Sequence, residues 1–319
     1  MQSNDSTIVI LGTGGTIAGT ASGNADGIGY TAAQRGVDDL VAAVPALADR
    51  WLDIEQVAQI DSKDMSHAVW QRLAQRLAHH LARSDVSGVV VTHGTDTLEE
   101  TAWFLQRVLA PAKPVVLTAA MKPADSPEAD GPRNLADAVS VAATLGASGV
   151  VVVMAGAVHG AADVRKRHPQ RVDAFDSGEN GPIGFVEDGD VRLVGHWPAG
   201  EALGLDRIAL PAMAWPRVEI VTAHAGADGA IVRALKDSGV QGLVVAATGN
   251  GTLHHALAVA LREAAAAGVR VLRSTRCAEG AVTSEIDELL PSAGGLSPWQ
   301  ARIELLLDLL KDGIRPTSA

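Results

Sequence analysis

The feature that most constrains the fold of this chain is a series of short apolar runs separated by segments with helical periodicity. The runs show almost no alternation of polar and apolar residues, which is typical of strands buried on both faces of a sheet. Such strands belong to parallel sheets, in which helices cover both faces. The runs span residues 8–11, 89–91, 115–117, 150–154, 243–247 and 269–272.

The segments between these runs repeat their apolar residues every three or four positions, as amphipathic helices do. Ser66 is placed to cap the first of them. Because strand, loop, helix and strand recur in this order, we expect an α/β fold. It would have a large N-terminal domain, with a mostly parallel sheet flanked by helices, and a smaller C-terminal α/β domain. The predicted helices span residues 68–81, 98–109, 135–145 and 298–310.

The chain has 319 residues, which is enough for two compact domains. We expect residues 1–195 to form the N-terminal domain and residues 217–319 the C-terminal one. Residues 196–216 are rich in Pro, Gly and Ala with little periodicity, and they predict a linker. Within the first domain, residues 187–190 read Glu-Asp-Gly-Asp between alternating segments, which indicates a hairpin turn.

The charge of the chain argues against two classes of partner. The formal net charge is −11, and no basic run is longer than residues 165–167. Nucleic acids and anionic membranes attract clustered Lys and Arg, so we expect neither as a partner. No apolar segment is long enough to span a bilayer. The N-terminus has no signal-peptide pattern, so we expect a cytoplasmic protein, or else a periplasmic mature form whose leader was removed.

Neither the cysteine nor the histidines indicate a cofactor. Cys277 is the only cysteine, so no intrachain disulfide is possible, and we expect an ordinary free thiol. The histidine pairs at 79–80 and 254–255 are adjacent on predicted helices, so their side chains point apart. Neither pair has the spacing of a zinc-binding helix. We therefore expect no metal and no cofactor.

Three loops follow predicted strands and have unusual sequences. In parallel α/β sheets, ligands bind beyond the carboxyl ends of the strands. Residues 12–19 form a glycine-rich loop after the first strand, and residues 92–97 follow the strand that ends at position 91. Residues 118–132 form the third loop, which contains Asp125 and Asp130.

The glycine-rich loop does not fit a nucleotide. A dinucleotide fingerprint needs glycine where this loop has Ile17, and a phosphate-binding loop needs lysine after its last glycine, where this chain has Thr20. The loop instead has Thr16 among glycines, whose backbone N–H groups can approach a ligand and stabilise an oxyanion. A threonine hydroxyl becomes a nucleophile only when a base or charge network activates it. Capping of the following helix is the alternative role of Thr16.

The second loop and the one tyrosine of the chain contain further candidate site residues. Thr95 and Asp96 place a second hydroxyl beside a carboxylate, which could bind a substrate ammonium; turn and cap chemistry is the alternative. Tyr30 is the only tyrosine and follows residues 20–29, a Gly-, Ser-, Asn- and Asp-rich stretch with the composition of a lid. Its hydroxyl could hydrogen-bond a nucleophile, although packing is the usual role of a lone tyrosine.

The motifs TGGTIAG (13–19) and HGTDT (93–97), taken together, resemble the bacterial L-asparaginases of the asparaginase/glutaminase family, close to the type II branch. Two separate motifs in the right order make this resemblance specific. It covers nearly the whole chain and extends to EETA (99–102), DGP (130–132), Asn134-Leu135, GNG (249–251) and RSTR (273–276).

The resemblance implies a catalytic role for each of five residues. Thr16 would be the primary nucleophile, with Tyr30 beside it on a mobile lid. Thr95, Asp96 and Lys166 would form a second network. The implied reaction hydrolyses L-asparagine to L-aspartate and ammonia through a threonine acyl-enzyme.

The resemblance also implies a substrate-binding set and an assembly. Ser62 and Asp96 would bind the α-carboxylate and α-ammonium of the substrate. The family forms homotetramers in which each site takes residues from a neighbouring C-terminal domain, here Asn250 and an acidic residue near Glu285. The full set of implied substrate-binding residues is Gly15, Ser62, Lys63, Gly94, Thr95, Asp96, Asn250 and Glu285.

Two alternative functions are compatible with the sequence. The first is a glutaminase-asparaginase of mixed specificity, because one methylene group in a substrate is worth only about 1–3 kcal/mol. The second is a non-catalytic amino-acid-binding module on the same fold. Such a module would need Asp96 but not both threonines and Lys166.

Lys63 departs from the family pattern, which often has Gln or Glu after the serine. A lysine near the substrate ammonium would repel it at a cost of about 1 kcal/mol or more. Alternatively, Lys63 turns to Asp61 or Asp64, or towards the α-carboxylate. We expect Lys63 to weaken substrate binding and to disfavour glutamine more than asparagine.

Overall fold

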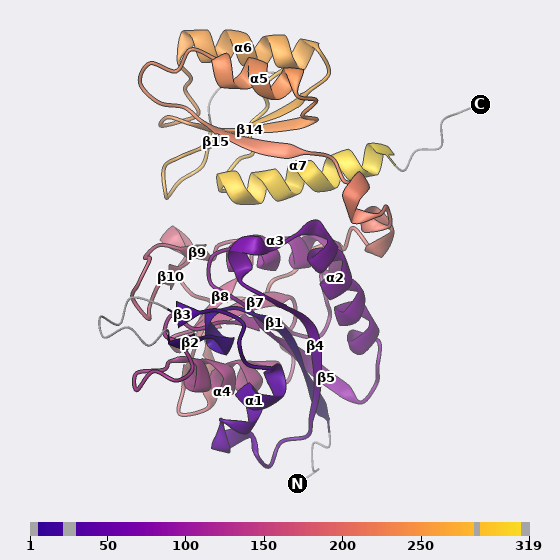
Figure 1. Ribbon diagram of the computed structural model, residues 1–319, viewed down its shortest axis with the longest axis vertical. Helices are drawn as coiled ribbons and strands as arrows, with labels where there is room; N and C mark the ends of the chain where they lie inside the picture. The colour runs from indigo at the N-terminus through magenta and orange to yellow at the C-terminus, as the bar shows by residue number, and fades with distance from the viewer. Residues whose placement is uncertain (1–5, 22–29, 284–287, 314–319) are drawn as a thin grey trace, which may run out of the picture. The chain divides into compact units, whose positions relative to one another are not determined.

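The computed structural model describes residues 6–21, 30–283 and 288–313. The chain divides into two compact units, Met1–Leu205 and Asp206–Ala319 (Figure 1). Each unit has its own sheet and its own helices.

Among the described residues of the first unit, eight strands form one sheet. In chain order they are β1 (Thr7–Gly14), β4 (Leu52–Ile60), β5 (Val86–Thr92), β6 (Val115–Thr118), β7 (Val150–Met154), β8 (Ala157–Gly160), β11 (Gly184–Glu187) and β12 (Asp190–Leu193). Their order in the sheet is β12-β11-β8-β7-β6-β5-β1-β4. The pairs from β4 to β7 are parallel, and those from β7 to β12 are antiparallel. The mostly parallel sheet expected from the sequence is therefore confirmed.

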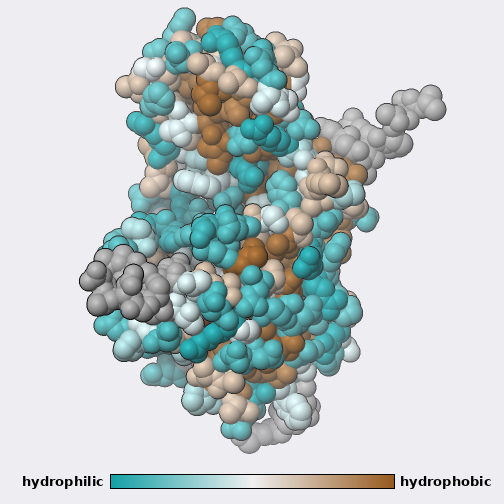
Figure 2. All heavy atoms as spheres, viewed as in Figure 1, coloured by the Kyte–Doolittle hydropathy of each residue, from teal (hydrophilic) through white to brown (hydrophobic). Residues whose placement is uncertain are grey.

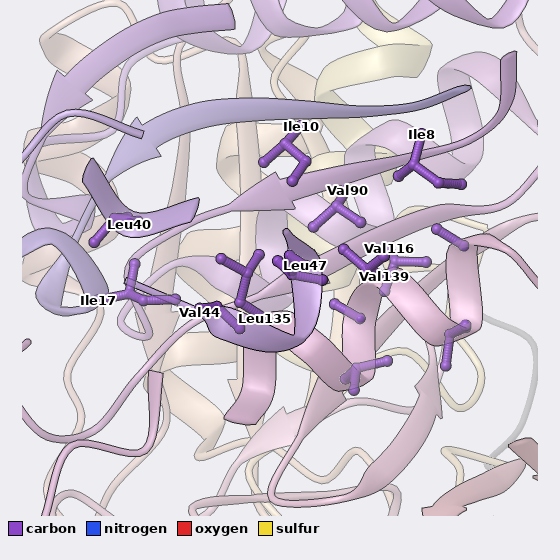
Figure 3. Close-up of a cluster of buried hydrophobic side chains, with 14 of the residues drawn as sticks. Ile8, Ile10, Ile17, Leu40, Val44, Leu47, Val90, Val116, Leu135 and Val139 are labelled. Atoms are coloured by element: carbon purple, nitrogen blue, oxygen red, sulfur yellow. The ribbon is translucent and has the colours of Figure 1, made fainter. Parts of the chain in front are cut away.

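Helices cover both faces of this sheet, which explains the uninterrupted apolar runs. Helices α1 (Val37–Ala42) and α4 (Gly131–Ala142) lie on one face, and α2 (His67–Leu81) and α3 (Leu98–Leu109) on the other (Figure 1). Successive strand side chains point to opposite faces. Ile10 of β1 therefore packs in the α1–α4 cluster (Figure 3), and its two neighbours in β1 point to the opposite face of the sheet.

Local sequence signals set several element boundaries. Ser66 caps α2, because its Oγ accepts a hydrogen bond from the Val69 N–H at 3.4 Å, as predicted. Helix α4 was predicted four residues too late: it begins at Gly131 with Pro132 in its first turn, a position where proline is favoured. The predicted end at Leu145 is also wrong, since α4 ends at Ala142 and the Leu145 side chain is 95% exposed.

Strand β4 has no counterpart among the apolar runs of the sequence. It lies at the edge of the sheet, and among the described residues its one partner strand is β1. Its residues alternate, with Ile54 packed against the core and Glu55 bonded to Arg76 and His80 on the α2 side. An edge strand that is only partly buried does not need a continuous apolar sequence.

The predicted hairpin turn is confirmed. Glu187 pairs with Asp190, and both residues between them have positive φ, 52° for Asp188 and 89° for Gly189. This is the geometry of a two-residue type I′ turn, which favours Asp-Gly.

The stretch predicted as a linker contains two short 3-10 helices, η5 (Leu205–Ile208) and η6 (Ala212–Ala214). Its first part belongs to the first unit. The N–H groups of Leu203 and Gly204 donate to carbonyl oxygens at the end of α3, at 2.9 and 3.0 Å.

The second unit is a smaller α/β layer structure. Strands β13 (Val218–Thr222), β14 (Gly242–Ala247) and β15 (Arg270–Thr275) form a parallel sheet in that order. Helices α5 (Ala230–Asp237) and α6 (His255–Ala266) pack on one face, and α7 (Pro298–Gly313) packs on the other (Figure 1). The expected fold class is thus confirmed for both units.

The surface of the protein is mainly polar in the view of Figure 2. Hydrophilic residues predominate on the face shown in Figure 2, and apolar residues form smaller patches between them. Within the described ranges, no helix has both the length and the apolar character needed to cross a bilayer.

Replacing Phe104 by alanine should destabilise the first unit strongly. The Phe104 ring is fully buried in α3 and stacks on Trp70 with ring centroids 5.0 Å apart. We expect Phe104→Ala to lower the free energy of unfolding by about 3–5 kcal/mol, because it leaves a cavity. Guanidinium unfolding followed by tryptophan fluorescence measures this. Leu145→Ala, at an exposed site, should change stability by less than about 0.5 kcal/mol; equal losses in the two variants would contradict the assignment of the core.

Candidate active site

The loops after β1 and β5 touch backbone to backbone at two glycines. Gly15 has a φ of 84°, and a Cβ at this position would collide with the backbone N and Cα of Gly94. Only glycine fits such an approach. Because each glycine directly precedes a buried threonine, the contact brings Thr16 and Thr95 to the same end of the sheet.

The loop after β4 joins the other two through Ser62. Ser62 is buried in the 3-10 helix η3 (Ser62–Asp64), and a Cβ on Gly94 would lie only 2.5 Å from its Oγ. The Asp96 N–H donates to Ser62 Oγ at 3.1 Å, and Thr97 Oγ1 donates to the Ser62 carbonyl at 2.8 Å. Ser62 is therefore locked to the loop that contains Asp96.

Thr16 is not a helix cap. It is the first residue of the short 3-10 helix η1 (Thr16–Ala18), whose N-cap is Gly15 and which has no side-chain capping bond. The next α-helix, α1, begins only at Val37. Thr16 therefore does not occupy the N-cap position of a helix, which contradicts the capping alternative raised by the sequence.

Thr95, Asp96 and Lys166 lie together. Lys166 Nζ donates to Thr95 Oγ1 at 2.8 Å and forms an ion pair with Asp96 Oδ1 at 2.6 Å. Lys166 lies on β9 (Arg165–Lys166), which pairs antiparallel with β10 (Phe175–Asp176). The Lys166 side chain is largely buried, whereas that of Asp96 is 48% exposed. The Asp96 carboxylate is thus accessible to solvent, while the Lys166 ammonium holds the neighbouring Thr95 hydroxyl.

Lys63 turns to Asp61, one of the alternatives left open by the sequence. Its Nζ lies 2.6 Å from Asp61 Oδ2, and its side chain is 65% exposed. Asp61 also accepts the Lys63 N–H at 3.3 Å as the N-cap of η3. A surface ion pair of this kind adds little to stability, but it reduces the field of the lysine at nearby sites.

His93 holds the Gly94 backbone through a hydrogen bond, a role that the sequence did not predict. The Trp70 indole N–H donates to Thr101 Oγ1 at 2.8 Å, and Thr101 Oγ1 lies 3.0 Å from His93 Nε2. His93 Nδ1 lies 2.7 Å from the Gly94 carbonyl, which can only accept, so Nδ1 bears the proton and Nε2 accepts from Thr101. Burial lowers the pKa of His93 to about 4, so the ring is neutral at pH 7.

Glu99 is a second residue that sequence reasoning did not single out, although it begins the EETA motif. Its Oε2 accepts the backbone N–H of Lys166 at 2.7 Å. Burial raises the pKa of the Glu99 carboxyl to about 7. The only sequence signal was its position just after the HGTDT motif.

Asp130 organises the loop after β6. Its carboxylate accepts the N–H groups of Met121 and Lys122 at 3.0 and 2.9 Å. The same loop is tied to the end of η1 by the Ala124 N–H, which donates to the Gly19 carbonyl at 3.0 Å. Asp130 therefore has a structural role beside the Thr16 loop.

The remaining predicted residues lie elsewhere or are not described. Asn250 is exposed in the second unit after β14, where its Oδ1 accepts the Thr283 N–H at 2.7 Å. The Tyr30 backbone lies in β3 (Tyr30–Thr31), paired with β2 (Thr20–Ala21). Of the predicted lid at 20–29, residues 22–29 lie outside the described residues, as do the side chain of Tyr30 and Glu285.

No metal centre is found in the part of the chain that the structure describes, where no three His, Cys, Asp or Glu side chains are grouped to hold an ion. His254 caps α6 by accepting the Ala256 N–H at 3.2 Å. Cys277 is an exposed free thiol.

Family models match both units of the chain. The model "Asparaginase, N-terminal" matches residues 7–198, and "Glutaminase/Asparaginase C-terminal domain" matches residues 217–316. L-asparaginase 2 of Escherichia coli is 40% identical over 95% of this chain and 88% of the relative. The probable periplasmic L-asparaginase of Haemophilus influenzae is 37% identical over the same two shares. A crystal structure of a probable cytoplasmic L-asparaginase from Campylobacter jejuni matches with a TM-score of 0.89 and 37% identity, covering 96% of this chain and 95% of that one.

The low pKa of His93 predicts a specific sensitivity to acid. The folded protein holds this ring neutral down to about pH 4, whereas the unfolded chain protonates it near pH 6.5. The stability contributed by His93 is therefore complete above pH 6.5 and is lost as the pH falls towards 4. Between pH 7.5 and pH 5 the free energy of unfolding should fall by about 2 kcal/mol from this residue.

Urea unfolding of the wild type and of His93→Gln at both pH values isolates the effect, because the buried His159 contributes equally to both proteins. The stability difference between them should shrink at pH 5. A difference that is constant with pH would show that His93 is not held neutral.

Proposed function

Because this chain belongs to the asparaginase family, we propose that it hydrolyses the side-chain amide of L-asparagine with Thr16 Oγ1 as the nucleophile. The observation that supports this most directly is the Gly15–Gly94 contact. It brings the buried Thr16 close to a second buried threonine, Thr95, which is held by the Lys166–Asp96 pair.

The reaction would proceed in two steps. Thr16 Oγ1 attacks the amide carbon, the carbon–nitrogen bond breaks, and the threonine proton leaves on the departing ammonia. A water molecule then attacks the resulting ester, which restores the Thr16 hydroxyl and releases L-aspartate. Dividing one difficult substitution into two easier ones is the advantage of a covalent intermediate.

In this proposal the second network orients a hydroxyl beside the reacting carbon. Lys166 Nζ donates to Thr95 Oγ1, so one lone pair of that oxygen is occupied and its proton is directed elsewhere. That proton can be donated to the substrate carbonyl or to the attacking water. Asp96 balances the charge of Lys166 and keeps it in place.

The substrate's amino-acid end would bind at Ser62 and Asp96. Ser62 Oγ accepts the Asp96 N–H, so the serine proton remains to donate to the α-carboxylate. The half-exposed carboxylate of Asp96 would bind the α-ammonium. The close backbones of Gly15 and Gly94 would line the same site.

We further propose a homotetramer in which Asn250 and an acidic residue near Glu285 complete the site of a neighbouring subunit. Asn250 lies in an exposed loop at the carboxyl end of β14, the sheet edge where α/β units bind ligands. Light scattering tests the assembly, and a monomer that is fully active at high dilution would contradict it.

Two further aspects stay predictions. The C-terminal model names both glutaminase and asparaginase, so a mixed specificity remains the alternative substrate range. We propose a cytoplasmic location; relatives bear both cytoplasmic and periplasmic names. Fractionation of the native host tests this, and recovery with periplasmic markers would contradict it.

A non-catalytic binder is disfavoured because Thr16, Thr95 and Lys166 are all present and buried or largely buried.

Removing the nucleophile should abolish turnover. We expect Thr16→Ala to lower kcat for ammonia release from L-asparagine by a factor on the order of 10⁶, as removal of a covalent nucleophile does in a serine hydrolase. Thr16→Ser keeps a hydroxyl and should retain measurable activity, and Thr13→Ser is a matched control in the same loop. Wild-type turnover in Thr16→Ala would refute the proposed nucleophile.

Charge at position 63 should tune the apparent affinity for substrate. Lys63→Gln removes a cation near the proposed ammonium site and should lower KM about fivefold, with a larger gain for L-glutamine than for L-asparagine. Asp61→Asn keeps the cap of η3 but removes a negative charge that lies beside the Lys63 cation, so KM should rise. Steady-state kinetics with both substrates measure these changes; unchanged KM values in both variants would rule out an electrostatic role for Lys63.

A further inference from the structure

Lys166 lies on a short strand outside the main sheet. Strand β9 has only two residues and pairs with β10 rather than with the main sheet. The Arg167 N–H donates across this pair to the Ala174 carbonyl at 2.7 Å. Successive N–H groups of a strand point to opposite sides, so that of Lys166 points away from β10. It donates instead to Glu99 Oε2 at 2.7 Å, in the first turn of α3.

We propose that Glu99 is a positioning residue for Lys166: its carboxyl group holds β9 against the start of α3, so that the lysine ammonium reaches both Thr95 and Asp96. This inference rests on the proposed function, because the position of Lys166 affects turnover only if Thr95 takes part in the reaction.

Three side-chain oxygens within residues 95–99 contact Lys166. Thr95 Oγ1 and Asp96 Oδ1 bind its Nζ, and Glu99 Oε2 binds its backbone nitrogen. A lysine side chain is a flexible four-carbon stem, so its ammonium is placed accurately only when its backbone is also fixed. Glu99 belongs to the same segment as Thr95 and binds the backbone of Lys166. The distance between Thr95 and Lys166 is therefore fixed.

Glu99 should also make this support depend on pH. Burial raises the pKa of its carboxyl to about 7, and the negative charge of Glu100 on the same helix adds to this. The Lys166 N–H and the cationic side chains of Arg165 and Lys166 on β9 act in the opposite direction. An ionised carboxylate accepts a stronger hydrogen bond than a neutral acid does. The wild-type kcat should therefore rise as the pH passes through about 7.

Two variants separate the hydrogen bond from the charge. Glu99→Ala removes the acceptor and should lower kcat about tenfold, the factor that corresponds to a hydrogen bond worth about 1.4 kcal/mol. The KM for L-asparagine should stay within about twofold, since Glu99 does not contact the proposed substrate groups. Glu99→Gln is nearly isosteric and keeps an acceptor oxygen. It should therefore keep most of the kcat but lose the inflection near pH 7.

Glu100→Gln is the matched control in the same helical turn. It should keep kcat within about twofold and move the inflection to lower pH, because a neighbouring negative charge is removed. Hydrogen exchange gives a readout independent of activity: the Lys166 amide should exchange faster in Glu99→Ala than in the wild type or in Glu100→Gln.

Unchanged kcat and an unchanged pH profile in both Glu99 variants would overturn the positioning role. So would a rise in KM that matches the fall in kcat, or Lys166 exchange that does not differ from the wild type. Thr16→Ala, assayed in parallel, distinguishes the two ideas. If it is active, the proposed function fails; if it is inactive while the Glu99 variants are normal, only the positioning role fails.

Discussion

The backbone contact between Gly15 and Gly94 is the constraint on which the candidate site depends. A Cβ on Gly15 would collide with the backbone of Gly94, and a Cβ on Gly94 would collide with Ser62, so the loops after β1, β4 and β5 can lie this close only because both residues are glycines. The hydroxyls of Thr16 and Thr95 follow directly in the chain and are buried as a result. Ser62 joins the same cluster from the loop after β4. The close approach of the loop backbones therefore places the side chains of the site.

The residues that hold this contact in place are buried and uncharged at pH 7, whereas the charged residues of the site are more exposed. His93, fully buried and uncharged at pH 7, bonds to the Gly94 carbonyl and is itself fixed by Thr101. The side chains of Asp96 and Lys63, in contrast, are 48% and 65% exposed. This division suits a hydrolase, because the scaffold has to keep its geometry while the charged groups meet a polar substrate.

The sequence predicted the framework well and the side-chain network poorly. Strands buried on both faces and the Asp-Gly turn have local signatures, so they were identified directly. Strand β4 was missed because an edge strand needs no continuous apolar run. The Lys166–Asp96 pair joins residues 70 positions apart, and it was anticipated only through family resemblance. Glu99 acts through a similarly non-local contact with Lys166, 67 positions away, which no spacing rule reveals. The bonds of His93 to Gly94 and Thr101 are local in the chain, but its burial and tautomer have no sequence signature.

The lone thiol of the chain has a practical consequence. Cys277 is exposed, and its N–H donates to Thr275 Oγ1, which in turn donates to the Gly249 carbonyl. A fluorophore attached through maleimide chemistry would modify one defined position, since no other cysteine competes. That dye would sit two hydrogen bonds from the loop of Asn250, so its emission could report on events at this loop without any engineered substitution.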